Sequence, residues 1–316
     1  MRVIYDLESL EKSDVYGVVT LGNFDGIHRG HRSIIQRCID EAEKIQGRSI
    51  VVSYDHQNSA VFHHHREFIT TTGEKIEILE NLGVDTLILI PFSEKIKNMT
   101  ADDFLSDLLV KKLNARVIVI GYDHHFGKNR EGDIDYLRNR SREFQYEVIQ
   151  MEPVYYLDRI ISSSRIRSDL VMGQLNKVSD QLGYDYMILG KVVAGYNRGM
   201  AIGFPTANIS VSEKKLLPLD GVFAGKAQIE INGQKTVKNC VVNIGKNPTF
   251  QNKKISVEVH LLDLSPDFSP NLYDQQIRVS LLVRLRDEKK FENVEALKNQ
   301  IRNDIEKAQT IFGAGI

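Results

Sequence analysis

Two histidines three residues apart stand in a glycine-rich stretch of the first half of the chain, Gly22-Asn23-Phe24-Asp25-Gly26-Ile27-His28-Arg29-Gly30-His31. A short β-branched run precedes this stretch and apolar residues at helical spacing follow it, which indicates a turn from a buried strand into a helix. Glycine lets the backbone approach a phosphate closely, and a helix start offers free N–H groups and the positive end of its dipole. The stretch therefore predicts that His28 and His31, on one face of the first turn, contact the oxygens of a reacting phosphate. The alternative is a tight turn followed by a helix with two solvated histidines.

A second anion-binding pattern, Ser162-Ser163-Ser164-Arg165-Ile166-Arg167, precedes a helical pattern further along the chain. Serine hydroxyls cap helix N–H groups or bind phosphate oxygens, and guanidinium groups bind such oxygens in pairs. Alone, the pattern is more typical of a plain serine N-cap followed by solvated arginines, because capping serines are common. Together with His28 and His31, it favours a phosphate site.

Glycines are dense again in the second half, where Gly190, Lys191, Gly195, Arg198 and Gly199 lead to Gly203-Phe204-Pro205-Thr206-Ala207-Asn208. Such density permits close approach of the backbone to phosphates. Thr206 and Asn208 are two residues apart in an extended segment and point to the same side. Their hydroxyl and amide oxygens are suitable hard ligands for Mg²⁺. By spacing alone, a glycine-rich hairpin with a proline turn is the more common interpretation of this pattern.

Two further histidine groups, His63-His64-His65 and His124-His125, suggest a metal site at first sight. Consecutive side chains in a strand or loop diverge, so they rarely converge on one ion. No Cys/His framework with zinc spacing surrounds them. We expect solvated or substrate-facing loops at both places.

The elements that position the first group of residues alternate between strand and helix. Continuous apolar strands that alternate with helices predict a parallel sheet covered on both faces, with ligands at the carboxyl ends of the strands. The glycine-rich turn and Gly121-Tyr122-Asp123 both fall at such ends. Strands are predicted at 17–21, 48–54, 85–90, 116–120 and 146–149, and helices at 75–82, 101–113 and 133–142.

The pattern changes near residue 183 to β-rich runs at short spacing, separated by turn signals such as Asn232-Gly233. These runs predict a small antiparallel barrel. A helix over 293–308, with Val294, Leu297, Ile301 and Ile305 on one face, closes the chain. The predicted barrel strands are 188–194, 222–229, 235–243, 256–262 and 276–285. The expected fold is α/β, with a Rossmann-like parallel-sheet domain over residues 1–182 and an antiparallel β-barrel with a terminal helix over 183–316.

Composition limits the class of protein. The 316 residues carry 41 Lys and Arg against 42 Asp and Glu. Nucleic-acid-binding proteins show a basic excess, so we expect no nucleic-acid partner. Two distant cysteines, Cys38 and Cys240, provide no disulfide framework. With no signal peptide or membrane-spanning run in the sequence, we expect a cytoplasmic protein with no membrane partner; the sequence specifies no oligomeric state.

The first half resembles a known family. His-x-Gly-His is the signature of the nucleotidyltransferase superfamily, and the fuller string Gly-Asn-Phe-Asp-Gly-x-His-x-Gly-His resembles the bacterial bifunctional riboflavin kinase/FAD synthetases. In that family Ile-Ser-Ser-Thr-Arg-Ile-Arg is the mobile loop that holds the triphosphate of ATP, and Ser164 here replaces the Thr. The resemblance implies that His28 and His31 are catalytic. It implies the following ATP-binding residues for adenylyl transfer: Gly22, Asn23, Phe24, Asp25, Gly26, His28, Gly30, His31, Ser162, Ser163, Ser164, Arg165 and Arg167.

Two segments of the first half depart from the family pattern. The family has Phe-x-Pro-His-Pro after its second strand, where this chain has Tyr54-Asp55-His56-Gln57-Asn58. It also has Gly-x-Asp-Phe-x-Phe-Gly after its fourth strand, where His124-His125 here separates Asp123 from Phe126. The resemblance implies that Asp123 and Phe126 contact the flavin or the nucleotide.

The second half resembles the riboflavin kinase domain, of which Gly-Phe-Pro-Thr-Ala-Asn is the hallmark. Several motifs follow in order, including Asn243–Phe250, Glu258–Asp263 and Arg286–Phe291. The resemblance implies that Glu258 is the general base that takes the proton of the ribityl 5′-hydroxyl; by pattern alone Glu258 is an exposed strand carboxylate. It implies ATP or flavin contacts for Gly190, Lys191, Gly195, Arg198, Gly199, Gly203, Pro205, Thr206, Asn208, Asn243, Gly245, Phe250 and Arg286, with Thr206 and Asn208 on the metal.

The resemblance implies two activities: phosphorylation of riboflavin to FMN in the barrel, and adenylylation of FMN to FAD with release of pyrophosphate in the sheet domain. ATP, riboflavin and FMN are the expected substrates, FMN and FAD the products, and Mg²⁺ or Mn²⁺ the metal. One alternative is a riboflavin kinase whose first domain binds nucleotide with weak or no adenylyl transfer. The other is a flavin-binding regulatory protein without turnover.

Overall fold

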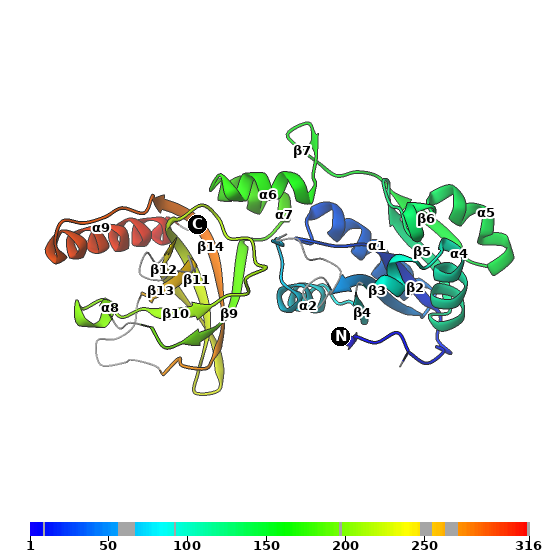
Figure 1. The fold of residues 1–316 in the computed structure, drawn as a ribbon, viewed down its shortest axis with the longest axis horizontal. Helices are drawn as coiled ribbons and strands as arrows, with labels where there is room; N and C mark the ends of the chain where they lie inside the picture. Colours follow the sequence, from blue (N-terminus) through cyan, green and yellow to red (C-terminus); the bar gives the residue numbers. More distant parts are fainter. Residues whose placement is uncertain are drawn as a thin grey trace. The chain divides into compact units, whose positions relative to one another are not determined.

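The computed structural model describes residues 1–8, 10–55, 67–91, 93–195, 198–246, 255–262 and 271–314 of the chain. The chain divides into two compact units, Met1–Ser163 and Ser164–Ile316 (Figure 1). The helices over residues 164–182 belong to the second unit because one of them packs against two barrel strands. The domain boundary at 182/183 stays a prediction.

The first unit contains a six-stranded sheet in the order β1-β4-β3-β2-β5-β6, and every neighbouring pair is parallel. The predicted parallel sheet is therefore confirmed. The edge strand β1 was not predicted; it is three residues long and pairs with β4, which no local pattern indicates. The strands are β1 (Arg2–Ile4), β2 (Gly17–Leu21), β3 (Arg48–Asp55), β4 (Thr86–Pro91), β5 (Ala115–Gly121) and β6 (Glu147–Met151).

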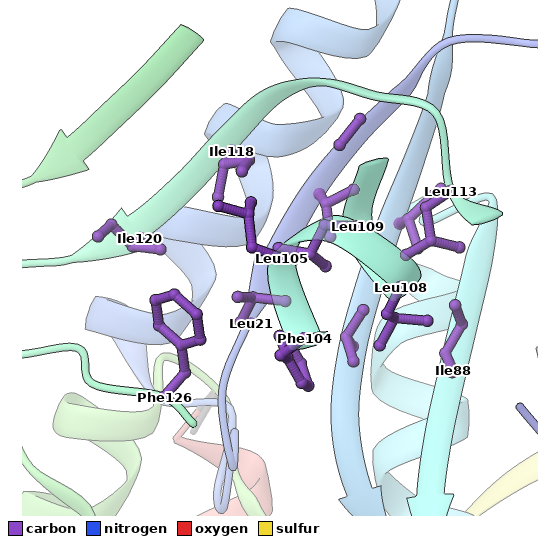
Figure 2. Close-up of a cluster of buried hydrophobic side chains, with 14 of the residues drawn as sticks. Leu21, Ile88, Phe104, Leu105, Leu108, Leu109, Leu113, Ile118, Ile120 and Phe126 are labelled. Carbon is purple, nitrogen blue, oxygen red and sulfur yellow. The ribbon is translucent and has the colours of Figure 1, made fainter. Parts of the chain in front are cut away.

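Helices cover both faces of this sheet, as the alternation of buried strand residues requires. On β2 and β5, Val18 and Val117 pack with α1 residues in one core, whereas Val19 and Ile118 pack in the other core against the helix over 104–112. Figure 2 shows the second core, where Leu105, Leu108 and Leu109 lie against the strand side chains. The helices are α1 (Arg29–Lys44), α2 (Thr72–Asn81), α3 (Glu94–Lys97), α4 (Ala101–Asp103), η1 (Phe104–Lys112), η2 (Lys128–Arg130) and α5 (Ile134–Phe144).

Two helix predictions in this unit need correction. The single helix predicted over 101–113 is a short α-helix, α4, that continues as the π-helix η1. Its buried positions, such as 104, 105, 108 and 109, suit either helix type, so the pattern does not distinguish them. Helix α2 begins at Thr72, ahead of the predicted start, because Thr71 and Glu74 form a capping box. A small hairpin of β7 (Tyr155–Tyr156) and β8 (Arg159–Ile160) ends the unit.

The second unit contains a closed barrel in the order β10-β13-β12-β11-β14-β9, in which all neighbouring strands are antiparallel. This confirms the predicted barrel. Strand β10 was predicted only as an extended segment. The strands are β9 (Tyr186–Val193), β10 (Ala207–Ser210), β11 (Gly221–Ile231), β12 (Gln234–Lys246), β13 (Ile255–Leu261) and β14 (Gln276–Arg286), and the helices α6 (Ser163–Val171), α7 (Leu175–Leu182), α8 (Arg198–Ala201) and α9 (Val294–Gly313).

The terminal helix α9 is longer than predicted and packs against the barrel through Ile305, Ala308 and Phe312. Val294, expected on the packed face, is 56% exposed because it lies in the first turn, just after the N-cap Asn293. The buried face instead includes the carboxylate of Asp304, which is 2% exposed.

Candidate functional site

The glycine-rich turn lies where β2 ends and α1 begins, at the carboxyl edge of the parallel sheet. Three of its residues have positive φ: Phe24 (46°), Gly26 (83°) and Ile27 (35°). Phe24 and Ile27 are nevertheless buried, at 2% and 0% exposure, so packing holds the two non-glycine residues in this unfavourable region. His28 is the N-cap of α1, which begins earlier than the apolar pattern alone indicated.

The two imidazoles stack on each other, with ring centroids 3.6 Å apart and an interplanar angle of 17°. A Cβ at residue 30 would lie 3.3 Å from the His28 ring, so glycine at this position leaves room for the stack. The Phe24 ring packs edge-on against His31, with centroids 5.2 Å apart. Both histidines therefore have defined orientations.

Hydrogen bonding and burial keep this pair neutral. The backbone N–H of His31 donates to Nδ1 of His28 over 3.3 Å, so Nδ1 carries no proton and the neutral His28 ring has its proton on Nε2. Burial lowers the pKa of His28 to about 4. Burial, together with charge repulsion from His28 and Lys75, lowers the pKa of His31 well below its ordinary value. Among the described residues, Nδ1 of His31 is buried without a hydrogen-bond partner.

The turn is fastened to the segment that leads into α2. Thr70 donates from its backbone N–H to Oδ1 of Asp25 over 3.1 Å, and its hydroxyl accepts from the Gly26 N–H over 3.0 Å. On the other side, the hydroxyl of Ser163 donates to the Asp25 carbonyl over 2.8 Å. Asp25 is 2% exposed, so its carboxylate is a buried hydrogen-bond acceptor that stabilises the turn.

A cavity of about 190 Å³ opens beside the imidazoles at the carboxyl edge of the sheet. It brings together several predicted residues, some of them far apart in sequence: the two histidines, Gly30, Asp123, Ser162 and Ser163. The remaining lining residues are Ile34, Gly121, Tyr122, Met151, Glu152, Pro153, Val154, Ile160 and Ile161. Apolar walls with convergent polar groups suit a small organic ligand.

Other predicted residues of the first half lie outside this cavity lining. Phe126 packs in the core against Phe104, with centroids 5.7 Å apart, and is 5% exposed (Figure 2). Its contact with flavin or nucleotide stays a prediction. Gly22 and Asn23 hold the turn through backbone bonds, with the Gly22 N–H donating to the Val52 carbonyl over 3.1 Å. Ser164, Arg165 and Arg167 follow in α6, which the second unit includes.

The second unit has its own cavity, of about 380 Å³, on the barrel. Four predicted residues line it: Gly195, Pro205, Thr206 and Asn208. The other lining residues are Val192, Val193, Met200, Ala207, Val259, Leu261, Asn271, Leu272 and Tyr273. Sequence reasoning missed residues 271–273, because no local pattern marks this short segment before β14.

Glycines shape this cavity around the two proposed metal ligands. A Cβ at Gly195 would overlap the amide group of Asn208. A Cβ at Gly199 would overlap the Phe204 carbonyl and lie 3.2 Å from the Thr206 hydroxyl. Glycine at both positions leaves room for these two side chains, whose oxygens are of the kind that a hard cation prefers. Their role as metal ligands stays a prediction.

Strand register places Glu258 near this cradle. Glu258 on β13 lies directly opposite Asn208 on β10 and Asn243 on β12. Directly opposed residues of neighbouring strands share a face, so the three side chains form one row. Glu258 itself is not among the residues that line the cavity.

The remaining predicted kinase residues are more dispersed. Lys191 pairs with Asp274 over 2.9 Å, and Gly190 lies against Ile209 within the barrel. Gly203 has φ 90° in the loop before β10, and Gly245 lies against the Glu288 carboxylate. The guanidinium of Arg286 is bonded to Asp304 and to the Asp287 carbonyl. Its part in ligand binding stays a prediction. The side chain of Arg198, and Phe250, lie outside what the structure describes.

In the described parts of the chain, no group of three or more His, Cys, Asp or Glu residues is arranged to hold a metal ion. His63-His64-His65 lie outside those parts. Within the same parts, no helix combines the length and the apolar character needed to cross a bilayer.

Comparisons with known proteins cover both units. A family model described as FAD synthetase matches residues 10–165, and one described as riboflavin kinase matches residues 182–312. The bifunctional riboflavin kinase/FMN adenylyltransferase of Escherichia coli K12 is 34% identical, over 99% of this chain and 98% of that protein. The protein of the same name from Haemophilus influenzae is 33% identical, over 99% and 100%. The chain belongs to the bifunctional riboflavin kinase/FMN adenylyltransferase family.

A solved structure shares the fold of the whole chain. A crystal structure titled as a macrolide-efflux protein from Streptococcus pneumoniae is 30% identical and covers 97% of this chain and 98% of its own, with a TM-score of 0.83. The fold of this family member is therefore also found in a protein whose title states a different role.

Sequence reasoning missed Lys75, a residue in this family member's first unit. Lys75 lies on α2, is 5% exposed, and bonds to the turn through the Asn23 carbonyl. A signal was present: Lys75 is three and four residues before Ile78 and Leu79, so it falls on the buried stripe of the helix. A charged residue on such a stripe indicates a specific partner.

The two departures from the family pattern also have defined structural neighbours. Asp55 is 2% exposed and accepts a hydrogen bond from the Thr72 hydroxyl over 3.0 Å, whereas residues 56–58 lie outside the described residues. His124 lies near Phe126, with centroids 6.1 Å apart. Burial lowers the pKa of His124 to about 4, so this histidine is neutral at physiological pH. It stands where the family pattern has the Phe that follows the Asp.

Proposed function

We propose that this chain carries out two consecutive ATP-dependent transfers, phosphorylating riboflavin to FMN in the second unit and adenylylating FMN to FAD in the first. The observation that carries the proposal is membership of the bifunctional family along 99% of the chain. The presence of a cavity in each unit supports the assignment of one reaction to each unit.

In the proposed adenylyl transfer, a phosphate oxygen of FMN attacks the α-phosphorus of ATP, the bond from that phosphorus to the bridging oxygen breaks, and pyrophosphate leaves. Such a reaction depends on positioning and charge stabilisation. We assign His28 and His31 to the phosphate oxygens, because a neutral imidazole donates one hydrogen bond, which in His28 comes from Nε2. The N–H groups of α1, the hydroxyls of Ser162 and Ser163, and the side chains of Ser164, Arg165 and Arg167 are proposed to bind the triphosphate.

In the proposed kinase reaction, the ribityl 5′-hydroxyl of riboflavin attacks the γ-phosphorus of ATP and ADP leaves. Glu258 is assigned as the general base that accepts the hydroxyl proton. The oxygens of Thr206 and Asn208 would hold Mg²⁺ or Mn²⁺, which supplies neutralisation of phosphate charge when bound. The other assigned residues then position ATP and flavin around this row.

The proposed partners are small molecules only. The charge balance of 41 basic and 42 acidic residues gives no reason to propose a nucleic-acid partner. A cytoplasmic location is proposed because both reactions consume ATP.

The deciding experiment incubates the purified chain with riboflavin and Mg-ATP and separates FMN from FAD by chromatography. We expect FMN first and FAD after it, with pyrophosphate released in step with FAD. No FMN from either oxidised or reduced riboflavin, with Mg²⁺ or Mn²⁺, would refute the kinase assignment. FMN without FAD would favour the alternative in which the first unit binds nucleotide only, an outcome to which the replaced segments at 54–58 and 124–125 point.

A further inference from the structure

The buried ammonium of Lys75 forms hydrogen bonds with the glycine-rich turn and with Ser53 of β3. Its Nζ donates to the Asn23 carbonyl and to the Ser53 hydroxyl, each over 2.8 Å, and the Ser53 hydroxyl donates to the same carbonyl over 3.1 Å. The Asn23 carbonyl therefore accepts two hydrogen bonds, which use both of its lone pairs. Because the peptide is trans and planar, this arrangement also sets the direction of the Phe24 N–H, away from Lys75.

The anchored peptide lies next to the strained part of the turn. Phe24, which follows Asn23, has φ 46°, a conformation that is unfavourable for a non-glycine residue. A hydrogen bond from a charged donor is stronger than one between neutral groups. The bond from Lys75 to the Asn23 carbonyl therefore helps to hold the turn in the form that places His28 at the N-cap of α1.

The charge of Lys75 acts on the same region. Asp25 in the turn and Asp55 at the end of β3 raise its pKa, while burial lowers it more strongly, to about 8. The other titratable groups that face it are His31 of α1 and Tyr54 of β3, with Glu74 next to it on its own helix. Burial raises the pKa of Tyr54, and His31 is neutral, so Lys75 supplies the positive charge beside these carboxylates.

We propose that Lys75 is a positioning residue for adenylyl transfer, which holds the Asn23 carbonyl, and with it the Gly22–Gly26 turn, in the conformation that presents His28 and His31 to the nucleotide. The inference rests on the proposed adenylyl transfer in the first unit. In this proposal Lys75 acts through its hydrogen bonds to the turn.

The test uses Lys75→Met, which keeps a long unbranched side chain and removes its charge. The control is Lys44→Met, the same substitution at an exposed lysine in the last turn of α1. FAD formation from supplied FMN and FMN formation from riboflavin are measured for each variant across pH. We expect Lys75→Met to lower kcat for FAD formation by about 10²-fold, the usual cost of a misplaced catalytic group, with a smaller change in KM. FMN formation and the Lys44→Met variant should match the wild type.

The pH profile separates positioning from a purely structural role. In the wild type, kcat for FAD formation should fall as pH rises through about 8, where Lys75 loses its proton, and Lys75→Met should lack this alkaline limb. Ser53→Ala keeps the ammonium of Lys75 but removes one hydrogen-bond acceptor of its charged form, which lowers the pKa of Lys75. The alkaline fall of kcat should therefore occur at lower pH in Ser53→Ala. This variant tests the proposal if Lys75→Met does not fold.

Wild-type kcat and an unchanged alkaline limb in Lys75→Met would overturn the proposal, as would an unmoved limb in Ser53→Ala. These outcomes differ from a failure of the proposed function, in which the wild-type chain itself would form FMN but no FAD.

Discussion

The imidazoles of His28 and His31 lie in one stack, 3.6 Å between ring centroids, with the backbone N–H of His31 donating to Nδ1 of His28. The first ring thus serves both as a helix cap and as a member of the proposed site. Since the same bond leaves the proton on Nε2, the backbone itself selects the tautomer that can donate to a phosphate. The capping of α1 and the tautomer of His28 therefore depend on the same hydrogen bond.

Substitution of His28 by Asn separates these two roles. Asn is a favourable N-cap, so His28→Asn should keep α1 capped and the first unit folded. It removes the imidazole donor, so FAD formation should fall by about 10²–10³, the cost of losing one preorganised donor to a reacting oxyanion. Chromatography of FAD and thermal unfolding measure the two effects. A stable variant with undiminished FAD formation would remove His28 from the proposed mechanism.

The neutral histidines also predict how stability depends on pH. The pKa values of His28 and His124 are lowered to about 4, and that of His31 is lowered well below its ordinary value. Between about pH 6.5 and 4 the unfolded chain binds more protons than the folded one, so stability is fully present above pH 6.5 and is lost as pH falls. Thermal unfolding of the first unit, followed across this window, should show a falling Tm.

A matched variant tests the origin of that slope. His124→Phe restores the residue type found in the family pattern and removes one titrating group, so its Tm should fall less steeply with acid than that of the wild type. An identical slope in the two proteins would contradict the assignment of His124 as a buried neutral histidine.

The row of Asn208, Glu258 and Asn243 predicts a selective loss in the other unit. Glu258→Gln keeps the shape of the side chain and its strand position but removes the base, so FMN formation should fall by about 10²–10⁴. FAD formation from supplied FMN should persist, since Glu258 belongs to the other compact unit. Kinase turnover at the wild-type rate would exclude Glu258 as general base.

The ion pair between Arg286 and Asp304 predicts a stability effect. Nε of Arg286 lies 3.0 and 2.9 Å from the two carboxylate oxygens, and Asp304 is 2% exposed on α9. Breaking a buried pair by removing one partner typically costs about 3–5 kcal/mol, so Asp304→Asn should lower the stability of the barrel unit markedly. Calorimetry should record a lower Tm, with the exposed Glu306→Gln on the same helix as the control. An unchanged Tm would mean that this pair does not fasten α9 to the barrel.

Much of the fold follows from local patterns. Continuous apolar runs that alternate with helical patterns predict the parallel sheet, and short β-rich runs predict the barrel. Strands buried on both faces have continuous apolar residues, and strands buried on one face have alternating ones, so both can be recognised in the sequence. The strand β1 and the residues 271–273 are not predictable in this way. Their places depend on neighbours distant in the chain: β1 pairs with β4, and residues 271–273 line the same cavity as Asn208 on β10.

The sequence by itself determined which residues are chemically equipped: His28 and His31 in a glycine-rich turn, Thr206 and Asn208 in an extended segment, and the order of two domains. Only the tertiary structure decided how they are used. It stacks the imidazoles and lowers their pKa values, it places the Lys75 ammonium under the Asn23 carbonyl, and it directs the Arg286 guanidinium to Asp304. The physical reason is that side-chain type is local, whereas burial, strand register and hydrogen-bond partners arise from contacts between segments far apart in the chain.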